Sequence, residues 1–496
     1  MPDRPNVVIV MTDQQRADHC AREGFALDTT PLLDSLARSG AWFDRAWTAS
    51  PSCLPARVSM LTGRLPSATG VRCNQNARPP RYEKDLPAVL AELGYRTALC
   101  GKNHSHARAD RWDYYSPYGH SAGHGRDDRT EQEAAFDEYL AGLCHRADYE
   151  PAPFPVECQG PCRATRDAMR WIDTLGGEPF FLWLTFAEPH NPYQVPEPYF
   201  SMFPPESLPP TRSGPEAWQD RGFKWRFTKQ LGRRGFADYD RQVPRARANY
   251  CGMLRLIDDQ VRRFVEFLDA RGLREETILV FVSDHGDFVG EYGLVRKGPE
   301  MPECLMRIPM LWTGPGIVGN ERPHEAHVSL VDVFPTICEA VGAPLPAGVQ
   351  GRSLWPLLTG GEYPRAEFES VYGEQGMGGL HYEEGDGLVD PTADGLHPSI
   401  SFDCLNSRSQ SGTMRAVRKG DWKLIFDMQG RGQLYDLAAD PVELANLFGR
   451  PEHAAKQQEL LADLLAWTIR TADPLPLPDH RYVVKTDPRN WWAGYR

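Results

Sequence analysis

A cysteine and an arginine four residues apart could form a site for an anionic group. In the stretch PSCLPARVSMLTG, Pro55 lies between Cys53 and Arg57, and Gly63 ends an apolar run. Because Pro favours the first position of a helix and Gly follows its last, we expect Cys53 at or just before a helix N-terminus, with Arg57 on the same face. The unpaired N–H groups and positive dipole end suit an anionic oxygen there. A cysteine phosphatase would need an arginine six positions after the cysteine, where Ser59 stands.

Four other groups of polar residues each follow an apolar run. The runs, at residues 6–11, 95–100, 180–186 and 278–282, have strand length and lack alternation, which favours a parallel sheet covered on both faces. The polar residues that follow them are Asp13 and Gln14, Lys102 and His104, His190, and Asp284 and His285. Ligands of such sheets bind beyond the carboxyl ends of the strands, so we expect these side chains to converge.

Helical stretches separate these runs. Apolar residues repeat at helical spacing over residues 32–37 and 253–268. We therefore predict a doubly wound α/β domain over residues 1–365, with a mostly parallel sheet and helices on both faces. Residues 366–496 are predicted to form a smaller C-terminal subdomain with an antiparallel sheet, one helix and a terminal arm.

Three segments lack clear periodicity. We predict a long loop at residues 373–412 and a Pro-rich insertion near the mouth of the site at residues 195–245. The terminal arm carries the pair Trp491 and Trp492. Because exposed paired tryptophans on a free tail are unusual, we expect them to pack on the same or a neighbouring subunit, and we expect a homo-oligomer.

The composition limits the class of protein. The net charge of -12 and the pI of about 5.7 argue against a nucleic-acid partner, which requires a basic surface. No run approaches the length of a membrane helix and the N-terminus lacks a signal-peptide pattern, so we expect no membrane association and a cytoplasmic location. The 11 cysteines include no CxxC pair, and we expect most of them to be reduced, buried thiols.

The pattern Cys53-Leu54-Pro55-Ala56-Arg57, followed by Leu61-Thr62-Gly63, resembles the signature of type I sulfatases. These are the formylglycine-dependent, arylsulfatase-like enzymes of the alkaline phosphatase superfamily. The resemblance covers nearly the whole chain, and its motifs occur in order. The matching segments are VVIVMTDQQR, GKNH, HNPY, SDHGD, the block from Lys297 to Arg307-Ile308-Pro309, KGDWKLI and LYDLAADPVELANL.

This resemblance implies two additions to the chain. A formylglycine-generating enzyme would oxidise Cys53 to Cα-formylglycine, whose hydrate supplies the nucleophile, and one divalent cation would bind beside it. The implied metal ligands are Asp13, Gln14, Asp284 and His285 together with residue 53. Many members have Asp in place of Gln14 and Asn in place of His285, whereas Gln with His is familiar from some sulfatase branches and from phosphonate monoester hydrolases. We expect Ca²⁺, with Mn²⁺ or Mg²⁺ as alternatives because of the imidazole.

The same resemblance implies the catalytic roles. Arg57 and Lys102 would hold the hydrate and neutralise negative charge. His104 would take a proton from the second hydroxyl, while His190 and Lys297 would contact the transferred group and protonate or shield the leaving oxygen. Weaker candidates are Arg72 and Asn76. We expect Asp18, Asp287 and Glu303 to lie behind the site residues or on the surface, and we assign no role in the site to His106, His120, His124, His381 and His397.

The predicted activity is hydrolysis of a small-molecule or saccharide sulfate ester to an alcohol and inorganic sulfate. A phosphonate monoester or phosphodiester hydrolase is the alternative, and the GKNH segment favours the sulfatase. A non-catalytic anion-binding homologue with unmodified Cys53 is a third hypothesis, which no residue favours. The sequence leaves open whether the ester is an aryl, carbohydrate or alkyl sulfate. The residues expected to shape the pocket are Arg108, Trp112, Tyr114, Tyr115 and Tyr193, with the Gly-rich loop after residue 373.

Overall fold

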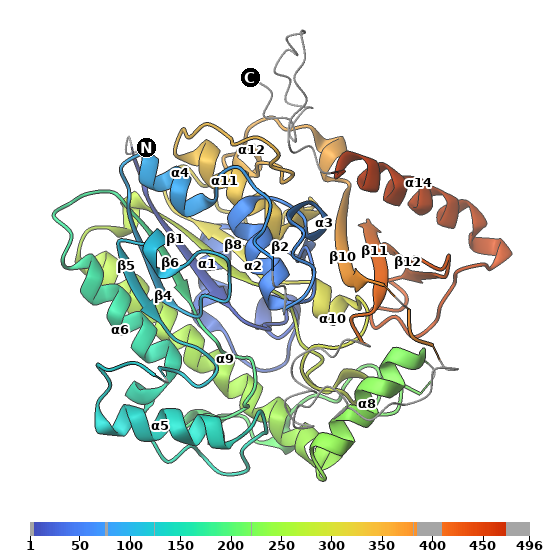
Figure 1. The fold of residues 1–496 in the computed structure, drawn as a ribbon, viewed down its shortest axis with the longest axis horizontal. Helices are drawn as coiled ribbons and strands as arrows, with labels where there is room; N and C mark the ends of the chain where they lie inside the picture. The colour runs from blue at the N-terminus through green and yellow to red at the C-terminus, as the bar shows by residue number, and fades with distance from the viewer. Residues whose placement is uncertain are drawn as a thin grey trace, which may run out of the picture.

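A seven-stranded, mostly parallel sheet forms the centre of the molecule (Figure 1). The computed structural model describes residues 4–74, 78–123, 125–219, 221–379, 381–383 and 409–472. The strands, in spatial order, are β2 (Ala41–Phe43), β8 (Met310–Thr313), β7 (Thr277–Ser283), β1 (Asn6–Thr12), β6 (Phe180–Thr185), β4 (Arg96–Gly101) and β5 (Tyr114–Pro117). The last five run parallel, and β8 pairs antiparallel with both β7 and β2. This confirms the predicted doubly wound α/β class.

The four apolar runs found in the sequence are β1, β4, β6 and β7. Met11 of β1 lies opposite Thr185 of β6 and opposite Val282 of β7. Gly101, the last residue of β4, also lies opposite Thr185. Because the strands are parallel and in this register, their carboxyl ends reach one edge of the sheet together. The polar residues that follow each strand therefore meet at that edge.

Helices cover both faces of the sheet, because successive strand residues point to opposite sides and both sets are apolar. Val7, Ile9 and Met11 pack toward one group of helices, and Val8 and Val10 pack toward the other. The first group is α2 (Cys53–Thr62), α4 (Leu86–Glu92), α11 (Val333–Ala340) and α12 (Trp355–Leu358). The second group, seen in Figure 1 with α6 and α9 side by side, is α1 (Pro31–Ser39), α6 (Gly160–Ile172) and α9 (Tyr239–Ala270).

The Pro-rich region at residues 195–245 is not an irregular insertion, which corrects our prediction. It contains α7 (Tyr199–Met202), α8 (Phe223–Gly235) and the start of α9, which carries Pro244 inside it. Aromatic residues of α8 and α9 pack together in an apolar cluster. Tertiary packing therefore supports helices that local sequence does not predict. The remaining short elements are α3 (Pro66–Thr69), α5 (Glu131–Gly142), α10 (Glu303–Met306), β3 (Ala46–Trp47) and β9 (Val328–Ser329).

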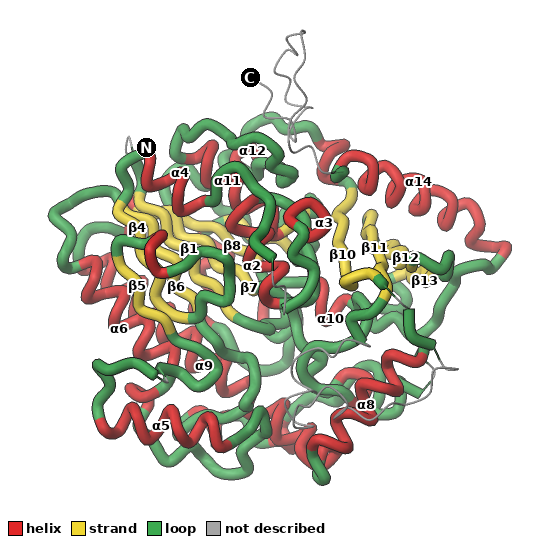
Figure 2. The backbone as a smooth tube through the Cα atoms, in the orientation of Figure 1, coloured by secondary structure: helices red, strands yellow, loops and turns green. Residues whose placement is uncertain are grey.

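A separate antiparallel sheet of four strands follows in the C-terminal part of the chain (Figure 2). Its elements are β10 (Ser370–Gly378), β11 (Gly412–Lys419), β12 (Trp422–Asp427), β13 (Gly432–Asp436) and the helix α14 (Ala454–Arg470). Leu460, Leu464 and Trp467 of α14 pack on the sheet. The small sheet and helix are as predicted. Strand β10 extends to residue 378, which corrects the start of the loop predicted at residues 373–412, and residues 380 and 384–408 of that segment lie outside the described residues. The boundary after residue 365 stays a prediction.

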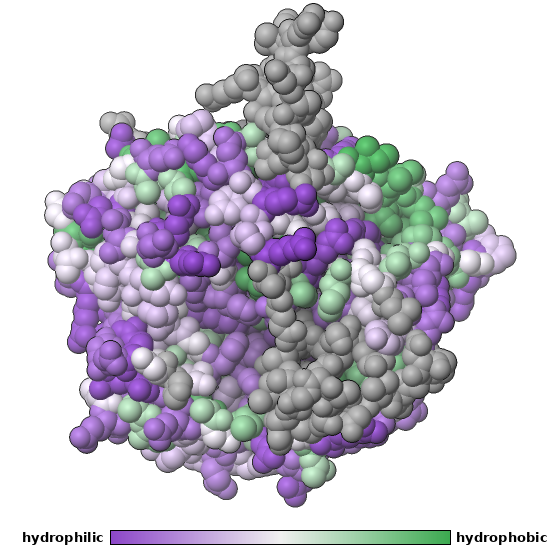
Figure 3. Space-filling model, viewed as in Figure 1, coloured by the Kyte–Doolittle hydropathy of each residue, from purple (hydrophilic) through white to green (hydrophobic). Residues whose placement is uncertain are grey.

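The outer face of α14 is apolar. Leu465 and Ile469 are 60% and 67% exposed, and Figure 3 shows a hydrophobic patch over this helix at the upper right. The arm with Trp491 and Trp492 lies outside the described residues, so its packing and the expected homo-oligomer stay predictions. Among the helices that the structure describes, none is long and apolar enough to cross a membrane.

Candidate active site

Helix α2 places residue 53 in the interior of the molecule. The helix begins at Cys53 and ends before Gly63, whose φ of 63° favours glycine. Cys53 is 1% exposed and Arg57 is fully buried. Pro55 is therefore the third residue of the helix and not the first, which corrects our prediction. Cys53 itself lies in the first turn, where backbone N–H groups have no intrahelical acceptor.

Four buried side chains converge at the start of α2. Asp13 follows β1, and Asp284 and His285 follow β7. The Cys53 sulfur lies 3.3 Å from His285 Nε2 and 3.6 Å from Asp13 Oδ1. His285 Nε2 is in turn 3.8 Å from Asp284 Oδ1 and 3.9 Å from Asp13 Oδ1. One ligand atom from each of the four residues lies within 4.8 Å of all the others.

The chemistry of this group fits a divalent cation. His285 Nδ1 lies 2.8 Å from the carbonyl oxygen of Gly286. A carbonyl can only accept, so Nδ1 carries the proton and Nε2 presents a lone pair to the group. Burial and the nearby Asp13 raise the pKa of Asp284, as expected for two carboxylates that face one another. A cation between them would compensate both buried charges.

Gln14 connects this group to further polar side chains. Its Nε2 donates to Asp287 at 2.8 Å, and its Oε1 accepts from Lys297 Nζ at 2.7 Å. Asp287, which we expected behind the site residues or on the surface, also accepts from the hydroxyl of Tyr193 at 2.8 Å. Asp287 thus holds Gln14 in place from behind. The role of Gln14 as a metal ligand stays a prediction.

Arg57 joins four of the strand ends. Its guanidinium donates to Asp284 Oδ2 at 2.8 Å and to Asp13 Oδ2 at 3.3 Å. It also donates to Thr185 Oγ1 at 2.9 Å and to the carbonyl of Lys102 at 2.8 Å. The planar fork of Arg suits such a fixed arrangement. Arg57 therefore compensates both carboxylates and fixes the start of α2 against the sheet edge.

Two lysine and histidine pairs flank the group. Lys102 Nζ lies 2.9 Å from His120 Nε2, and Lys297 Nζ lies 3.1 Å from His190 Nε2. The rings of His120 and His190 are in contact, with centroids 3.8 Å apart and planes tilted by 31°. Burial, His120 and Lys297 together lower the pKa of His190 well below 6.5. His190 is therefore neutral at neutral pH.

Buried cations determine the ionisation of the acidic groups. Burial alone would raise the pKa of Asp13, but Lys102, with which it makes an ion pair, holds it well below its usual range together with His190, Arg57 and Lys297. Burial and Asp13 would likewise raise the pKa of the Cys53 thiol. The two lysines overcome these effects, and the pKa lies well below its usual value. The ammonium groups of Lys102 and Lys297 thus both lower the pKa of residue 53.

His120 belongs to this cluster although we assigned it no role, because we recognised no strand before it. In the structure β5 ends at Pro117, three residues earlier. This strand is short and half-buried, so it lacks the continuous apolar pattern of the other four; the available signal was the pair Tyr114-Tyr115. His104, which we did predict, is half-buried with a φ of 33°. Within the described residues no hydrogen bond joins His104 to the cluster, and its role stays a prediction.

Asn74 is a second residue that the sequence did not reveal. Its Oδ1 accepts from Ser52 Oγ at 2.8 Å, and its Nδ2 faces the Cys53 sulfur at 4.0 Å. It follows the signature helix without any motif of its own, so no pattern points to it. Of the two weaker candidates nearby, Arg72 is half-buried and Asn76 lies outside the described residues.

Most of the aromatic residues that we expected in the pocket are structural. Trp112 and Tyr114 pack on aromatic side chains of the core. Tyr193 is buried and donates its hydroxyl to a buried aspartate. Tyr115 is half-buried and Arg108 is exposed, so these two remain candidates for the pocket wall. Among the other histidines, His106 lies 3.1 Å from Asp85 and His381 lies 3.8 Å from Asp427, whereas His124 and His397 fall outside the described residues.

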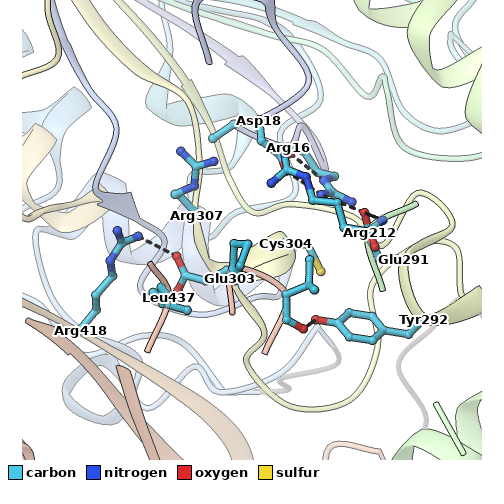
Figure 4. A pocket seen from close by; sticks show the side chains of 13 residues that line it. Arg16, Asp18, Arg212, Glu291, Tyr292, Glu303, Cys304, Arg307, Arg418 and Leu437 are labelled. Carbon is cyan, nitrogen blue, oxygen red and sulfur yellow. Dashed lines mark hydrogen bonds and ion pairs between the residues drawn. The ribbon is translucent and has the colours of Figure 1, made fainter. Parts of the chain in front are cut away.

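A second charged region lies at the boundary between the main sheet and the C-terminal sheet (Figure 4). We call it the seam cavity; its volume is about 140 Å³. Its charged lining residues are Arg16, Arg212, Arg307, Arg418, Asp18, Glu291 and Glu303. Arg16 pairs with Asp18 at 2.7 Å, and Arg418 pairs with Glu303 at 2.8 Å. Asp18 and Glu303, which we expected behind the site residues or on the surface, thus line this separate cavity.

Comparison with known proteins identifies the family. The family model described as Sulfatase matches residues 5–343. The chain belongs to the sulfatase family. It is therefore a sulfuric ester hydrolase of the alkaline phosphatase superfamily, and the matched residues include every strand end that contributes to the site.

The alignments with individual relatives extend over both sheets of this sulfatase. An arylsulfatase of Clostridium perfringens is 27% identical over 475 residues, which cover 91% of either chain. A multifunctional alkaline phosphatase superfamily protein of Trinickia caryophylli is 28% identical, over 95% of this chain and 96% of that protein. The crystal structure of a phosphonate monoester hydrolase of Agrobacterium radiobacter has a TM-score of 0.77 at 22% identity, over 95% of this chain and 97% of that chain. At that identity it supports the fold alone.

Proposed function

We propose that this sulfatase hydrolyses a sulfate monoester of an alcohol or a saccharide by means of a Cα-formylglycine made from Cys53 and one divalent cation. The observation that supports this most directly is the convergence of two carboxylates, one imidazole and two lysines on residue 53, which is 1% exposed. The hydrated aldehyde supplies a hydroxyl nucleophile, and the cation lowers the pKa of that hydroxyl.

The side chains of the site prepare the ester for attack. Lys102 and Lys297 bring positive charge to residue 53 from two sides, which favours binding of the anionic group. Because His190 is neutral and Lys297 donates toward its Nε2, the proton for the leaving oxygen is held on Lys297 Nζ. His190 keeps that ammonium in position, because its Nε2 accepts from Lys297 Nζ at 3.1 Å.

The metal ligands proposed are Asp13, Asp284, His285 and Gln14, with residue 53. Carboxylate and amide oxygens favour Ca²⁺, and the imidazole also suits Mn²⁺ or Mg²⁺. We expect the purified protein to contain one equivalent of divalent metal by elemental analysis, and Asp284→Asn to remove it. An equal metal content in the Asp284→Asn protein would contradict this assignment.

The state of residue 53 is tested by mass spectrometry of its peptide. After co-expression with a formylglycine-generating enzyme, the peptide should be about 18 Da lighter than the cysteine form. Sulfate release from a panel of aryl, alkyl and saccharide sulfates then identifies the ester. A peptide that stays a thiol, in a protein that still releases sulfate, would refute the proposed nucleophile.

A phosphonate monoester or phosphodiester hydrolase is the second candidate. It is favoured by the pairing of Gln14 with His285 at the metal group. An aryl sulfate and a phenyl phosphonate ester should be compared side by side, and we expect the larger kcat/KM for the sulfate. A much larger value for the phosphonate would reverse the order of the two proposals.

A further inference from the structure

We propose that His120 is a positioning residue that directs the ammonium of Lys102 toward the group transferred at residue 53. This inference rests on the proposed function, because it assigns a role within the same site. His120 follows β5, at the edge of the parallel strands, and so enters the site from a strand that contributes no other polar side chain to the described cluster. The argument depends on the geometry around Lys102.

An ammonium has three N–H donors, and their directions are fixed relative to one another. One donor of Lys102 is used by Asp13, and a second points to His120 Nε2 at 2.9 Å. The described residues thus provide two acceptors and leave one N–H for residue 53 or for the transferred group. With both acceptors present, the third N–H can take only one direction. With Asp13 alone, the ammonium could rotate about that single contact.

The imidazole of His120 must present a lone pair at Nε2 for this contact, since Lys102 can only donate. The same arrangement is seen in the neighbouring pair. His190 Nδ1 lies 2.6 Å from the carbonyl of Asn191, so its proton is on Nδ1 and its Nε2 accepts from Lys297. The contact of the two tilted rings, with centroids 3.8 Å apart, holds the pairs side by side. Each lysine is therefore oriented by a histidine of its own.

If His120 had only a structural role, any flat ring packed against His190 would be sufficient. Two substitutions separate the functions of the imidazole. His120→Phe keeps a ring for stacking but removes the acceptor, whereas His120→Gln loses the ring and can place an amide oxygen near the position of Nε2. If orientation of Lys102 is what matters, the Gln variant should be the more active of the two.

The measurement is steady-state kinetics of both variants. We expect His120→Phe to lower kcat about 30-fold with KM changed less than about threefold, because small misplacements of catalytic groups cost up to about 100-fold in rate. We expect His120→Gln to stay within about fivefold of the parent. Melting temperatures of the variants control for folding. If the Phe variant does not fold, His120→Ser takes its place, since its side chain is too short to reach Lys102.

A double-mutant cycle with Lys102→Ala tests whether His120 acts through that lysine. When Lys102 is absent, the His120→Phe change should cost less than about twofold further. An equal cost in both backgrounds would overturn the proposal, and so would a Gln variant as slow as the Phe variant.

The test of His120 can be distinguished from the test of the proposed function. The cycle is measured with whichever ester the parent hydrolyses, so a preference for the phosphonate changes the proposed substrate and leaves this test intact. A second readout does not depend on turnover: calorimetric binding of inorganic sulfate to Cys53→Ser protein. Binding should weaken at least about fivefold with His120→Phe and less than about twofold with His120→Gln. Equal affinity of the His120→Phe protein and its parent would overturn the inference.

Discussion

The cluster around Cys53 and the seam cavity are both rich in buried charge, but their charges are arranged differently. In the seam cavity the charges form separate groups: Arg16 pairs with Asp18 at 2.7 Å and with Glu291 at 3.8 Å, whereas Arg418 pairs with Glu303 at 2.8 Å. Around Cys53 the charges are shared: Arg57 donates to both carboxylates of the metal group. The shared contacts all lie within reach of one atom, the sulfur of residue 53.

This difference shows which property marks a site in this protein. Burial and charge are common to both regions. What distinguishes the site is that side chains from several strand ends point at one position, which parallel register makes possible. In the seam, the pair of Arg418 with Glu303 connects the C-terminal sheet to the main domain, whereas Arg16 and Asp18 are two residues apart in one segment. We therefore expect substitutions in the cluster to change catalysis, and substitutions in the seam to change stability.

The largest expected effect is that of Cys53→Ala. Without residue 53 as precursor of the nucleophile, sulfate release should fall by at least about 10,000-fold, while the remaining site still binds the ester. The assay is release of sulfate from an aryl ester by protein with an unchanged melting temperature. Activity of the Cys53→Ala protein near that of the parent would show that the convergence on this atom has no catalytic meaning.

Lys297→Ala should have the next largest effect. If its ammonium carries the proton for the leaving oxygen, kcat should fall about 100- to 1,000-fold for an alkyl sulfate. The loss should be smaller for an aryl sulfate with an acidic leaving group, which needs less protonation. Kinetics on the two esters check this. Equal losses on both esters would assign Lys297 to binding alone.

Glu303→Gln tests the seam. Glu303 pairs with Arg418 and also with Lys423, at 3.1 Å. Its loss leaves two buried cations less well compensated, and the free energy of unfolding should fall by about 2 kcal/mol. At neutral pH kcat should stay within about twofold of the parent. Denaturant unfolding and kinetics measure the two quantities, and a tenfold loss of kcat at unchanged stability would break the contrast between the regions.

The same substitution has a defined dependence on pH. Burial would raise the pKa of Glu303, but Lys423, Arg418 and Arg307 lower it from 4.5 to about 2. A carboxyl with a lowered pKa in the folded state contributes stability that is present above pH 4.5 and is lost as the pH falls toward 2. Between pH 5 and pH 3 the parent should therefore lose stability more steeply than Glu303→Gln. Parallel curves of stability against pH for the two proteins would contradict the ion pairs of Glu303 in the seam.

Arg212→Ala should have the smallest effect. Arg212 lines the seam cavity but is exposed, and its side chain has no ion pair among the described residues. We expect a change in the free energy of unfolding of less than about 0.5 kcal/mol and no change in kcat. A clear loss of activity would show that this arginine acts on the ester, and the seam would then be part of the site.

The sequence was most informative where one strand supplied both an apolar run and a polar end. Asp13 and His285 were found in this way, because buried parallel strands read as continuous apolar runs and their register brings their ends together. Family resemblance supplied the expected roles, which spacing alone could not give. The partners of Gln14 were not foreseeable, since its contacts with Asp287 and Lys297 join positions more than 270 residues apart.

The failures have physical causes. His120 was missed because β5 is a four-residue edge strand that is mostly half-buried and has no continuous apolar run. Asn74 was missed because it acts from an irregular segment. Helix α8 was missed because prolines and glycines around it hide a helix that depends on aromatic packing against α9. In each case the information lies in contacts with distant residues and not in the local pattern.

The burial of α2 limits when Cys53 could be modified relative to folding. Cys53 is 1% exposed, and Pro55 and Arg57 are also buried, so an enzyme that reads these residues cannot reach them once the helix has packed on the sheet. If Cys53 is modified as we propose, its oxidation and the folding of the chain compete in time. A chain that folds first would then stay a stable but inert protein. The active fraction of a preparation would therefore record how quickly nascent chains fold compared with how quickly they meet the modifying enzyme.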